Sequence, residues 1–165
     1  MSDPHVFATE FARAAERITN NALIDEWVAL YDADATAEWV FDGMAETHRG
    51  ISEISAAADE LATLWRSRAL TVHKQVESAT ADTIVLSWTG GFGGRDSQIG
   101  VEIWTLADGL VVGHRMYGHL DVRASDQLAA RLRLAATSPR IATAIARHRM
   151  RRRIRRAIRG PESPR

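Results

Sequence analysis

The chain has 165 residues, of which 45% are hydrophobic and none is cysteine. This length accommodates one domain and a short extension, and the lack of cysteine excludes disulfides, catalytic thiolates and thiolate metal sites. The formal net charge of zero is the sum of two oppositely charged parts of the chain. Residues 1–139 carry 11 basic and 20 acidic side chains (−9), whereas residues 140–165 carry ten arginines and one glutamate (+9).

The first half of the chain has the apolar spacing of helices. Apolar residues recur every three or four positions over Phe7–Thr19, Leu23–Tyr31 and Ser52–Ser67, which predicts three amphipathic helices. Between the second and third, Ala35–Phe41 alternates as a strand does and is followed by an Asp-Gly turn at 42–43.

After residue 69 the period changes from 3.6 to 2. Strands are predicted at Leu70–Glu77 and Thr83–Phe92, and the glycine-rich end of the second, residues 90–94, suits a bulged and bent strand. Residues 96–123 then form a long β-hairpin around Asp108-Gly109. The expected fold class is α+β, in which a curved antiparallel sheet shaped like a cone wraps around three N-terminal helices and a basic helical tail follows.

Three segments together resemble the nuclear transport factor 2-like superfamily. They are Leu30–Glu38, Arg49–Ile54 and the hairpin residues Asp108–Val111 with Arg115 and Tyr117 beyond them. The superfamily includes SnoaL-like polyketide cyclases, ketosteroid isomerases, scytalone dehydratases and limonene epoxide hydrolases. The resemblance implies a SnoaL-like domain over residues 1–123, an arginine-rich extension over 124–165, and a homodimer.

The catalytic positions of those enzymes carry over unevenly. The acid of the ketosteroid isomerase oxyanion hole matches Glu102, and a histidine of the scytalone dehydratases matches His73. Trp39 stands where ketosteroid isomerases carry their proton-shuttling aspartate, and Met116 stands where limonene epoxide hydrolases carry theirs. The resemblance therefore implies cofactor-free acid–base chemistry without fixing the reaction, since the fold serves many activities.

We take three residues as candidate catalytic groups: His73, Glu102 and His114. A carboxyl among Ile, Val and Trp has a raised pKa and can serve as acid or base, or donate a hydrogen bond when protonated. A two-residue loop in the hairpin places Glu102 opposite Arg115, in an ion pair, whereas a three-residue loop places it opposite His114. His73 lies in a polar stripe that faces either solvent or a cavity, and His114 has the alternative of a buried, hydrogen-bonded structural role. In the catalytic interpretation one of these histidines moves the proton, and a protonated Glu102 donates a hydrogen bond to the developing enolate oxygen.

Candidate ligand-contacting residues are Trp39, Trp88, Met116 and Gly118. The first three give the aromatic and thioether lining that suits a hydrophobic ligand. Gly118 occupies a position where a bulky residue is common in the superfamily, which predicts a wider cavity. No closely spaced pair of metal ligands occurs, so we expect neither a metal nor another cofactor.

The C-terminal extension is rich in arginine and predicted to be helical over Ser138–Arg159, with Ser138 and Pro139 at its start. Twenty of the 21 basic residues of the whole chain are arginine, and the exception is Lys74, which we interpret as a codon preference. The extension is either a solvated helix, a helix docked on the acidic body of the dimer, or a binder of anionic membrane or nucleic acid.

Two functions remain open for the domain, and a third hypothesis makes the basic extension the functional part of the chain. The first is cofactor-free isomerisation, dehydration or cyclisation of a hydrophobic polyketide-, steroid- or terpene-like compound. The alternative is a non-catalytic module that binds a ligand or a protein and is localised by its basic tail. The absence of an apolar run of about 18 residues and the charged N-terminus lead us to expect a cytoplasmic protein.

Overall fold

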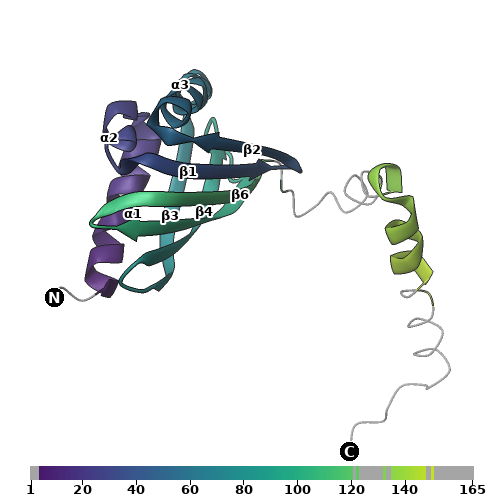
Figure 1. Ribbon diagram of the computed structural model, residues 1–165. Coiled ribbons are helices and arrows are strands. Elements are labelled where there is room, and N and C mark those ends of the chain that lie inside the picture. The colour runs from purple at the N-terminus through teal and green to yellow at the C-terminus, as the bar shows by residue number, and fades with distance from the viewer. Residues whose placement is uncertain (1–3, 121, 123–131, 133–134, 148–149, 151–165) are drawn as a thin grey trace, which may run out of the picture. The chain divides into compact units, whose positions relative to one another are not determined.

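The computed structural model describes residues 4–120, 122, 132, 135–147 and 150. They belong to two units, residues 1–122 and 123–165, and each unit is described by itself. In the first unit a six-stranded sheet curls without closing and is accompanied by three helices (Figure 1). This is the α+β cone expected from the sequence.

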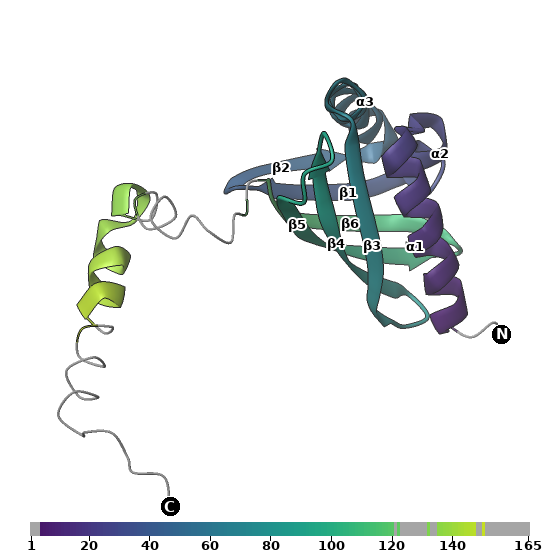
Figure 2. The ribbon, with the colours of Figure 1, turned by 180° about the vertical axis from the view of Figure 1, so that it is seen from behind.

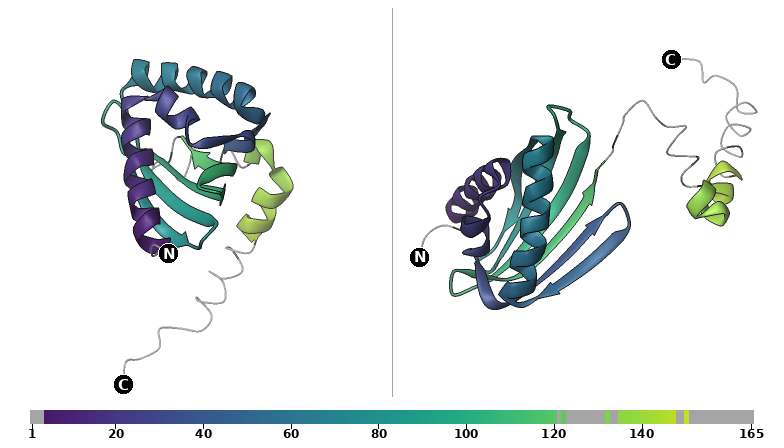
Figure 3. Two further views of the ribbon diagram at one scale, coloured as in Figure 1. Left: turned by 60° about the vertical axis from the view of Figure 1, so that its left-hand side comes forward. Right: turned by 90° about the horizontal axis from the view of Figure 1, so that it is seen from above.

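The helices are α1 (Pro4–Asn21), α2 (Ile24–Val28) and α3 (Gly50–Arg68). Helices α1 and α3 lie along two sides of the curled sheet (Figure 3), and α1 buries an apolar stripe against it that includes Ala8, Phe11, Ala15 and Ile18. Helix α2 is shorter than predicted, because the chain enters the sheet at Tyr31.

The six strands follow the order β2-β1-β6-β5-β4-β3. Their bounds are β1 Tyr31–Phe41, β2 Met44–Arg49, β3 Leu70–Ala79, β4 Thr83–Phe92, β5 Gln98–Ala107 and β6 Leu110–His119. The β1–β6 pair is parallel and the other neighbouring strands are antiparallel. The expectation of a wholly antiparallel sheet was therefore wrong for this one pair. Strand β2 was not predicted, because it is largely exposed and lacks an apolar face.

Helix α1 covers the free edge of the sheet at β3 (Figure 2). The side chain of Asn20 accepts a hydrogen bond from Val72 N–H and donates one to Val72 C=O. Glu16 accepts one from Lys74 N–H. These contacts satisfy backbone groups that an edge strand otherwise leaves open to another chain.

A bulge in the β5–β6 hairpin sets which residues share the inner face. Ala107 pairs with Leu110 across the two-residue turn, but the register shifts by one residue at Val112. As a result Glu102 pairs with Met116, and Trp104 with His114. Neither loop predicted from the sequence gave this register, because both assumed a regular ladder beyond the turn. The bulge places Glu102 and His114 on the same buried face.

The second unit is described in part. Its described helical residues include 139–147, and the backbone of Ala142 donates to Ser138 C=O at 3.0 Å, which agrees with a helix beginning at Pro139. Residues 148, 149 and 151–159 of the predicted helix lie outside the described residues. No helix among the described residues is both long and apolar enough to cross a membrane.

Candidate functional site

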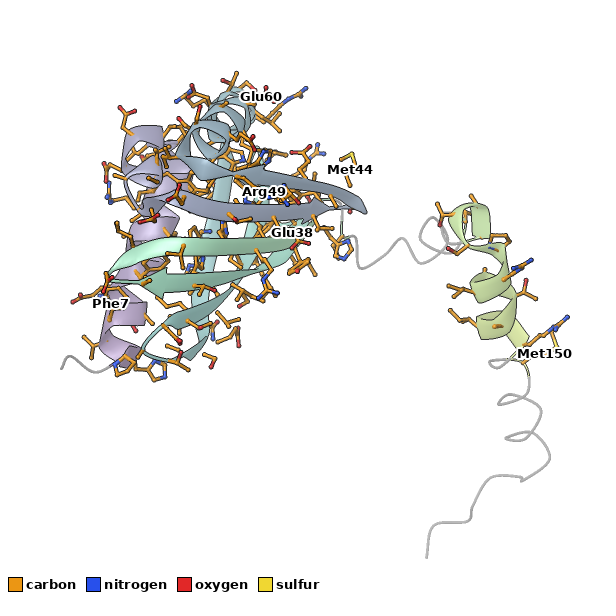
Figure 4. All side chains as sticks on the ribbon, in the orientation of Figure 1. Phe7, Glu38, Met44, Arg49, Glu60 and Met150 are labelled. Carbon is orange, nitrogen blue, oxygen red and sulfur yellow. The ribbon has the colours of Figure 1, made fainter. Side chains whose placement is uncertain are left out.

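The first unit contains a cavity of about 230 Å³ between the helices and the inner face of the sheet. Its wall is mostly apolar and aromatic. Met44, at the turn between β1 and β2 (Figure 4), and Leu64 on α3 belong to the lining and are exposed. We therefore place the mouth of the cavity between the β1–β2 hairpin and α3.

Lys74 and Glu102 form an ion pair in the wall of the cavity. Each side chain is only 4% exposed, and the Lys74 ammonium donates a short hydrogen bond to Oε1 of Glu102. The second carboxylate oxygen, Oε2, accepts a hydrogen bond from the indole N–H of Trp104 at 3.0 Å. Both oxygens of Glu102 thus accept from donors, which is the arrangement of a carboxylate rather than of a carboxyl group that donates.

His114 is held beside this pair by three aromatic side chains. The Tyr31 hydroxyl lies 2.7 Å from Nδ1 of His114, and the Trp39 indole nitrogen lies 3.4 Å from the same atom. The ring of Trp104 stacks on the imidazole, with centroids 3.7 Å apart and an angle of 11° between the planes. Trp104 therefore positions both Glu102 and His114.

The protonation state of His114 follows from these contacts. Burial, with a further contribution from the Lys74 ammonium, holds the pKa of His114 well below its usual value of 6.5. Burial, and then the Glu102 charge, raises the pKa of Tyr31 well above 10. Tyr31 therefore keeps its proton, and the Trp39 indole can only donate, so Nδ1 is the acceptor for both. A neutral imidazole with an unprotonated Nδ1 carries its proton on Nε2.

Two buried N–H groups in the cavity lining have no hydrogen-bond partner among the described residues: Nε2 of His114 and Nε1 of Trp88. Native proteins pair nearly all their buried polar atoms, so unpaired ones are typical of sites that await a ligand or ordered water. Nε2 of His114 carries its proton in the state derived above, and an indole N–H can only donate, so both groups call for a hydrogen-bond acceptor such as a carbonyl oxygen.

The cavity brings together most of the residues selected from the sequence. Glu102, His114, Trp39, Trp88 and Met116 all line it. Its lining as a whole consists of Thr19, Trp27, Trp39, Phe41, Met44, Glu46, Leu61, Leu64, Trp65, Leu70, Val72, Lys74, Trp88, Phe92, Gln98, Glu102, His114, Met116 and Leu120.

His73 and Gly118 do not line the cavity. The side chain of His73 is 78% exposed and lies 3.0 Å from Glu16 of α1, because alternation along β3 turns it away from the inner face. A Cβ at Gly118 would approach the ring of Phe41 to 2.6 Å and that of Trp88 to 3.1 Å. The missing side chain thus makes room for two aromatic rings and does not widen the cavity.

The sequence reasoning missed Lys74, which shares the inner face of β3 with Leu70 and Val72. The available signal was a single lysine among apolar residues of one strand face, in a chain whose other basic residues are all arginine. Among the described residues, no group of three histidine, aspartate or glutamate side chains could hold a metal ion.

Comparison with solved structures identifies the architecture. A SnoaL-like protein of unknown function from Burkholderia thailandensis superposes with a TM-score of 0.58 and 17% identity, over 71% of this chain and 98% of that one. A candidate isomerase from Bacillus subtilis superposes with a TM-score of 0.56 and 16% identity, over 71% of this chain and 89% of that one. For a candidate ketosteroid isomerase from Kribbella flavida the TM-score is 0.53 and the identity 18%, over 67% of this chain and 76% of that one. This chain has the nuclear transport factor 2-like fold.

The likeness concerns the SnoaL-like cone and not a particular chemistry, because the identities are low. No protein-family model matches the sequence, and no curated protein does.

Proposed function

We propose that the SnoaL-like cone binds a hydrophobic compound that carries a carbonyl-type oxygen and transforms it by proton transfer without a cofactor. The observation that carries this proposal is a mostly apolar cavity whose lining includes two residues with buried N–H groups that lack a partner among the described residues, His114 at Nε2 and Trp88 at Nε1. A ligand oxygen that accepts from either donor relieves a cost of about 1–3 kcal/mol for leaving that donor unpaired.

Proton transfer is assigned to Glu102. Its carboxylate is the buried base of the cavity, and removal of a proton next to a carbonyl moves negative charge onto the carbonyl oxygen. The Lys74 ammonium and the His114 N–H supply positive and dipolar stabilisation for that charge in a wall that excludes water. Isomerisation, dehydration and cyclisation all include such a step.

A second candidate function is ligand binding without turnover. It is favoured by the contacts of Glu102, whose two oxygens are already engaged by Lys74 and Trp104. A carboxylate held in this way has both oxygens occupied by donors of the protein, which favours a structural role over proton abstraction. The two functions differ in whether a bound ketone exchanges its protons.

The experiment compares 1-tetralone with tetralin, its parent hydrocarbon, on the full chain. Ligand-observed NMR should show that the ketone binds at least about tenfold tighter, or about 1.4 kcal/mol. In D₂O the chain should also accelerate deuterium exchange of the ketone's α-protons, and Glu102→Gln should abolish that acceleration. His114→Phe and Trp88→Phe should reduce the preference for the ketone.

The outcomes separate the candidates. Binding with no accelerated exchange supports the binding function and rejects the enzyme. Equal affinity for ketone and hydrocarbon, unchanged in both donor variants, rejects the role given to the two N–H groups. A His73→Ala variant is the matched control, because this histidine lies outside the cavity and its loss should change neither binding nor exchange.

A further inference from the structure

Lys74 is the one lysine of the chain, and it lies in the wall of the cavity. The other 20 basic residues are arginine, whose guanidinium cannot be deprotonated in proteins. A lysine amine can lose its proton when it is withdrawn from water, and it is then a nucleophile. Lys74 thus carries the one side-chain amine of this protein that can form an imine with a carbonyl compound.

The surroundings of Lys74 provide what such an attack needs. Its side chain is 4% exposed and hydrogen-bonded to a carboxylate that can accept its proton. Leu70, Val72 and Trp88 belong to the same wall and keep it apolar. In surroundings that solvate charge poorly, transfer of the proton from the ammonium to Glu102 replaces two buried ions by two neutral groups.

We propose that Lys74 is a carbonyl-reactive amine, which forms an imine with an aldehyde or ketone in the cavity while Glu102 accepts and returns the proton. This inference rests on the proposed function, since the carbonyl compound must first enter the cone. It narrows the ligand class from any oxygen-bearing hydrophobic compound to aldehydes and ketones.

Imine formation needs no proton donor or acceptor other than Lys74, Glu102 and the carbonyl compound. Glu102 takes one proton from the ammonium, and the Nζ lone pair attacks the carbonyl carbon while the π electrons move to oxygen. One proton then passes from nitrogen to that oxygen, which gives a neutral carbinolamine. Glu102 returns its proton to the hydroxyl, water leaves as the C–O bond breaks, and the nitrogen lone pair forms the C=N bond. The product is a protonated imine, and the carboxylate is restored.

The protonated imine would also serve the proton transfer assigned to Glu102. It withdraws electrons from the neighbouring carbon more strongly than a carbonyl group does, so the adjacent C–H becomes more acidic. The same carboxylate lies within hydrogen-bond distance of Nζ and is therefore close to the bonds formed at that nitrogen.

The test is reductive trapping with cinnamaldehyde and sodium cyanoborohydride near pH 7. The chain offers one ε-amine, so intact mass and peptide mapping assign the adduct without competing lysines. We expect one cinnamyl group on Lys74, formed at least about tenfold faster in the folded chain than in urea. The reason is that the cavity holds the aldehyde next to the amine. The N-terminal amine serves as the internal reference for ordinary amine reactivity.

Two variants and one matched ligand complete the design. Lys74→Arg keeps the charge and Lys74→Met the approximate length, and neither should give the adduct. Cinnamyl alcohol has the same skeleton without the carbonyl group, and ligand-observed NMR measures its binding and that of cinnamaldehyde.

The outcomes distinguish this inference from the proposed function. An adduct confined to the N-terminal amine, or faster labelling of Lys74 in urea, overturns the inference. If cinnamaldehyde nevertheless binds to the folded chain, the proposed function stands without it. If neither ligand binds and Lys74 stays unlabelled, both proposals are wrong.

Discussion

The ion pair between Lys74 and Glu102 permits a direct test of the electrostatics of the cavity by a double-mutant cycle. Lys74→Met leaves the carboxylate buried with the Trp104 N–H but without a counter-charge, and Glu102→Gln leaves the ammonium without one. Removing one partner of a buried pair typically costs about 3–5 kcal/mol. Since a domain of this size is stable by about 5–15 kcal/mol, each single variant should lose a large part of its stability.

The double variant should lose much less than the sum of the two. It has no charge at the site of the pair, and the glutamine oxygen can still accept from Trp104. What remains is an amide N–H₂ without a partner, at a cost of about 1–3 kcal/mol. The coupling free energy should therefore be at least about 3 kcal/mol in favour of the pair.

Urea unfolding at pH 7 measures this coupling, provided that the four chains share one m-value. If a single variant is unfolded without urea, recovery of a cooperative transition in the double variant carries the same information. Additive losses, within about 0.5 kcal/mol, would mean that the two charges do not depend on each other. That result would refute both the buried pair and the proton exchange built on it.

Three further predictions concern the neighbours of the pair. As pH falls below about 6.5, His114 binds a proton in the unfolded chain before it does so in the folded chain, so the stability that its low pKa preserves above that pH is lost below it. Urea titrations should show that His114→Asn reduces the slope of unfolding free energy against pH in this range by up to about 1.4 kcal/mol per pH unit. Tyr31→Phe removes a donor to Nδ1 of His114 and should cost about 1–3 kcal/mol in urea; ¹⁵N shifts of the parent that place the proton on Nδ1 would contradict the assignment. Gly118→Ala, whose Cβ would press on Phe41, should cost about 1–3 kcal/mol, whereas the control Gly113→Ala, at ordinary contact distance, should cost less in the same assay.

The sequence predicted the elements of the cone better than their register. Alternation along a strand puts Trp39, Glu102, His114 and Met116 each on a definite face. Which faces of two strands coincide depends on the hairpin, and a bulge at Val112 shifted that relation by one residue. The local signal was Gly113, which follows Val112 and interrupts the strand pattern as glycines at bulges do, but the pattern alone does not fix the direction of the shift.

The error at His73 has a different cause. Polar side chains on alternate positions of a strand indicate either solvent or a lined cavity, and histidine is the usual acid–base residue at neutral pH. The structure places His73 towards solvent and the next residue, Lys74, inside. The apolar alternation of Leu70 and Val72 had already assigned Lys74 to the buried face, but a lysine there contradicts its usual exposure.

That contradiction is itself informative about the site. A buried ion pair contributes little to stability compared with well-packed apolar residues of similar size, because desolvation of both charges opposes their attraction. A cavity of about 230 Å³ and two N–H groups without a partner among the described residues are further costs in the same part of the fold. Three such costs, gathered around Lys74, Glu102 and His114, are hard to explain by folding and are typical of positions where a sequence gives up stability for function.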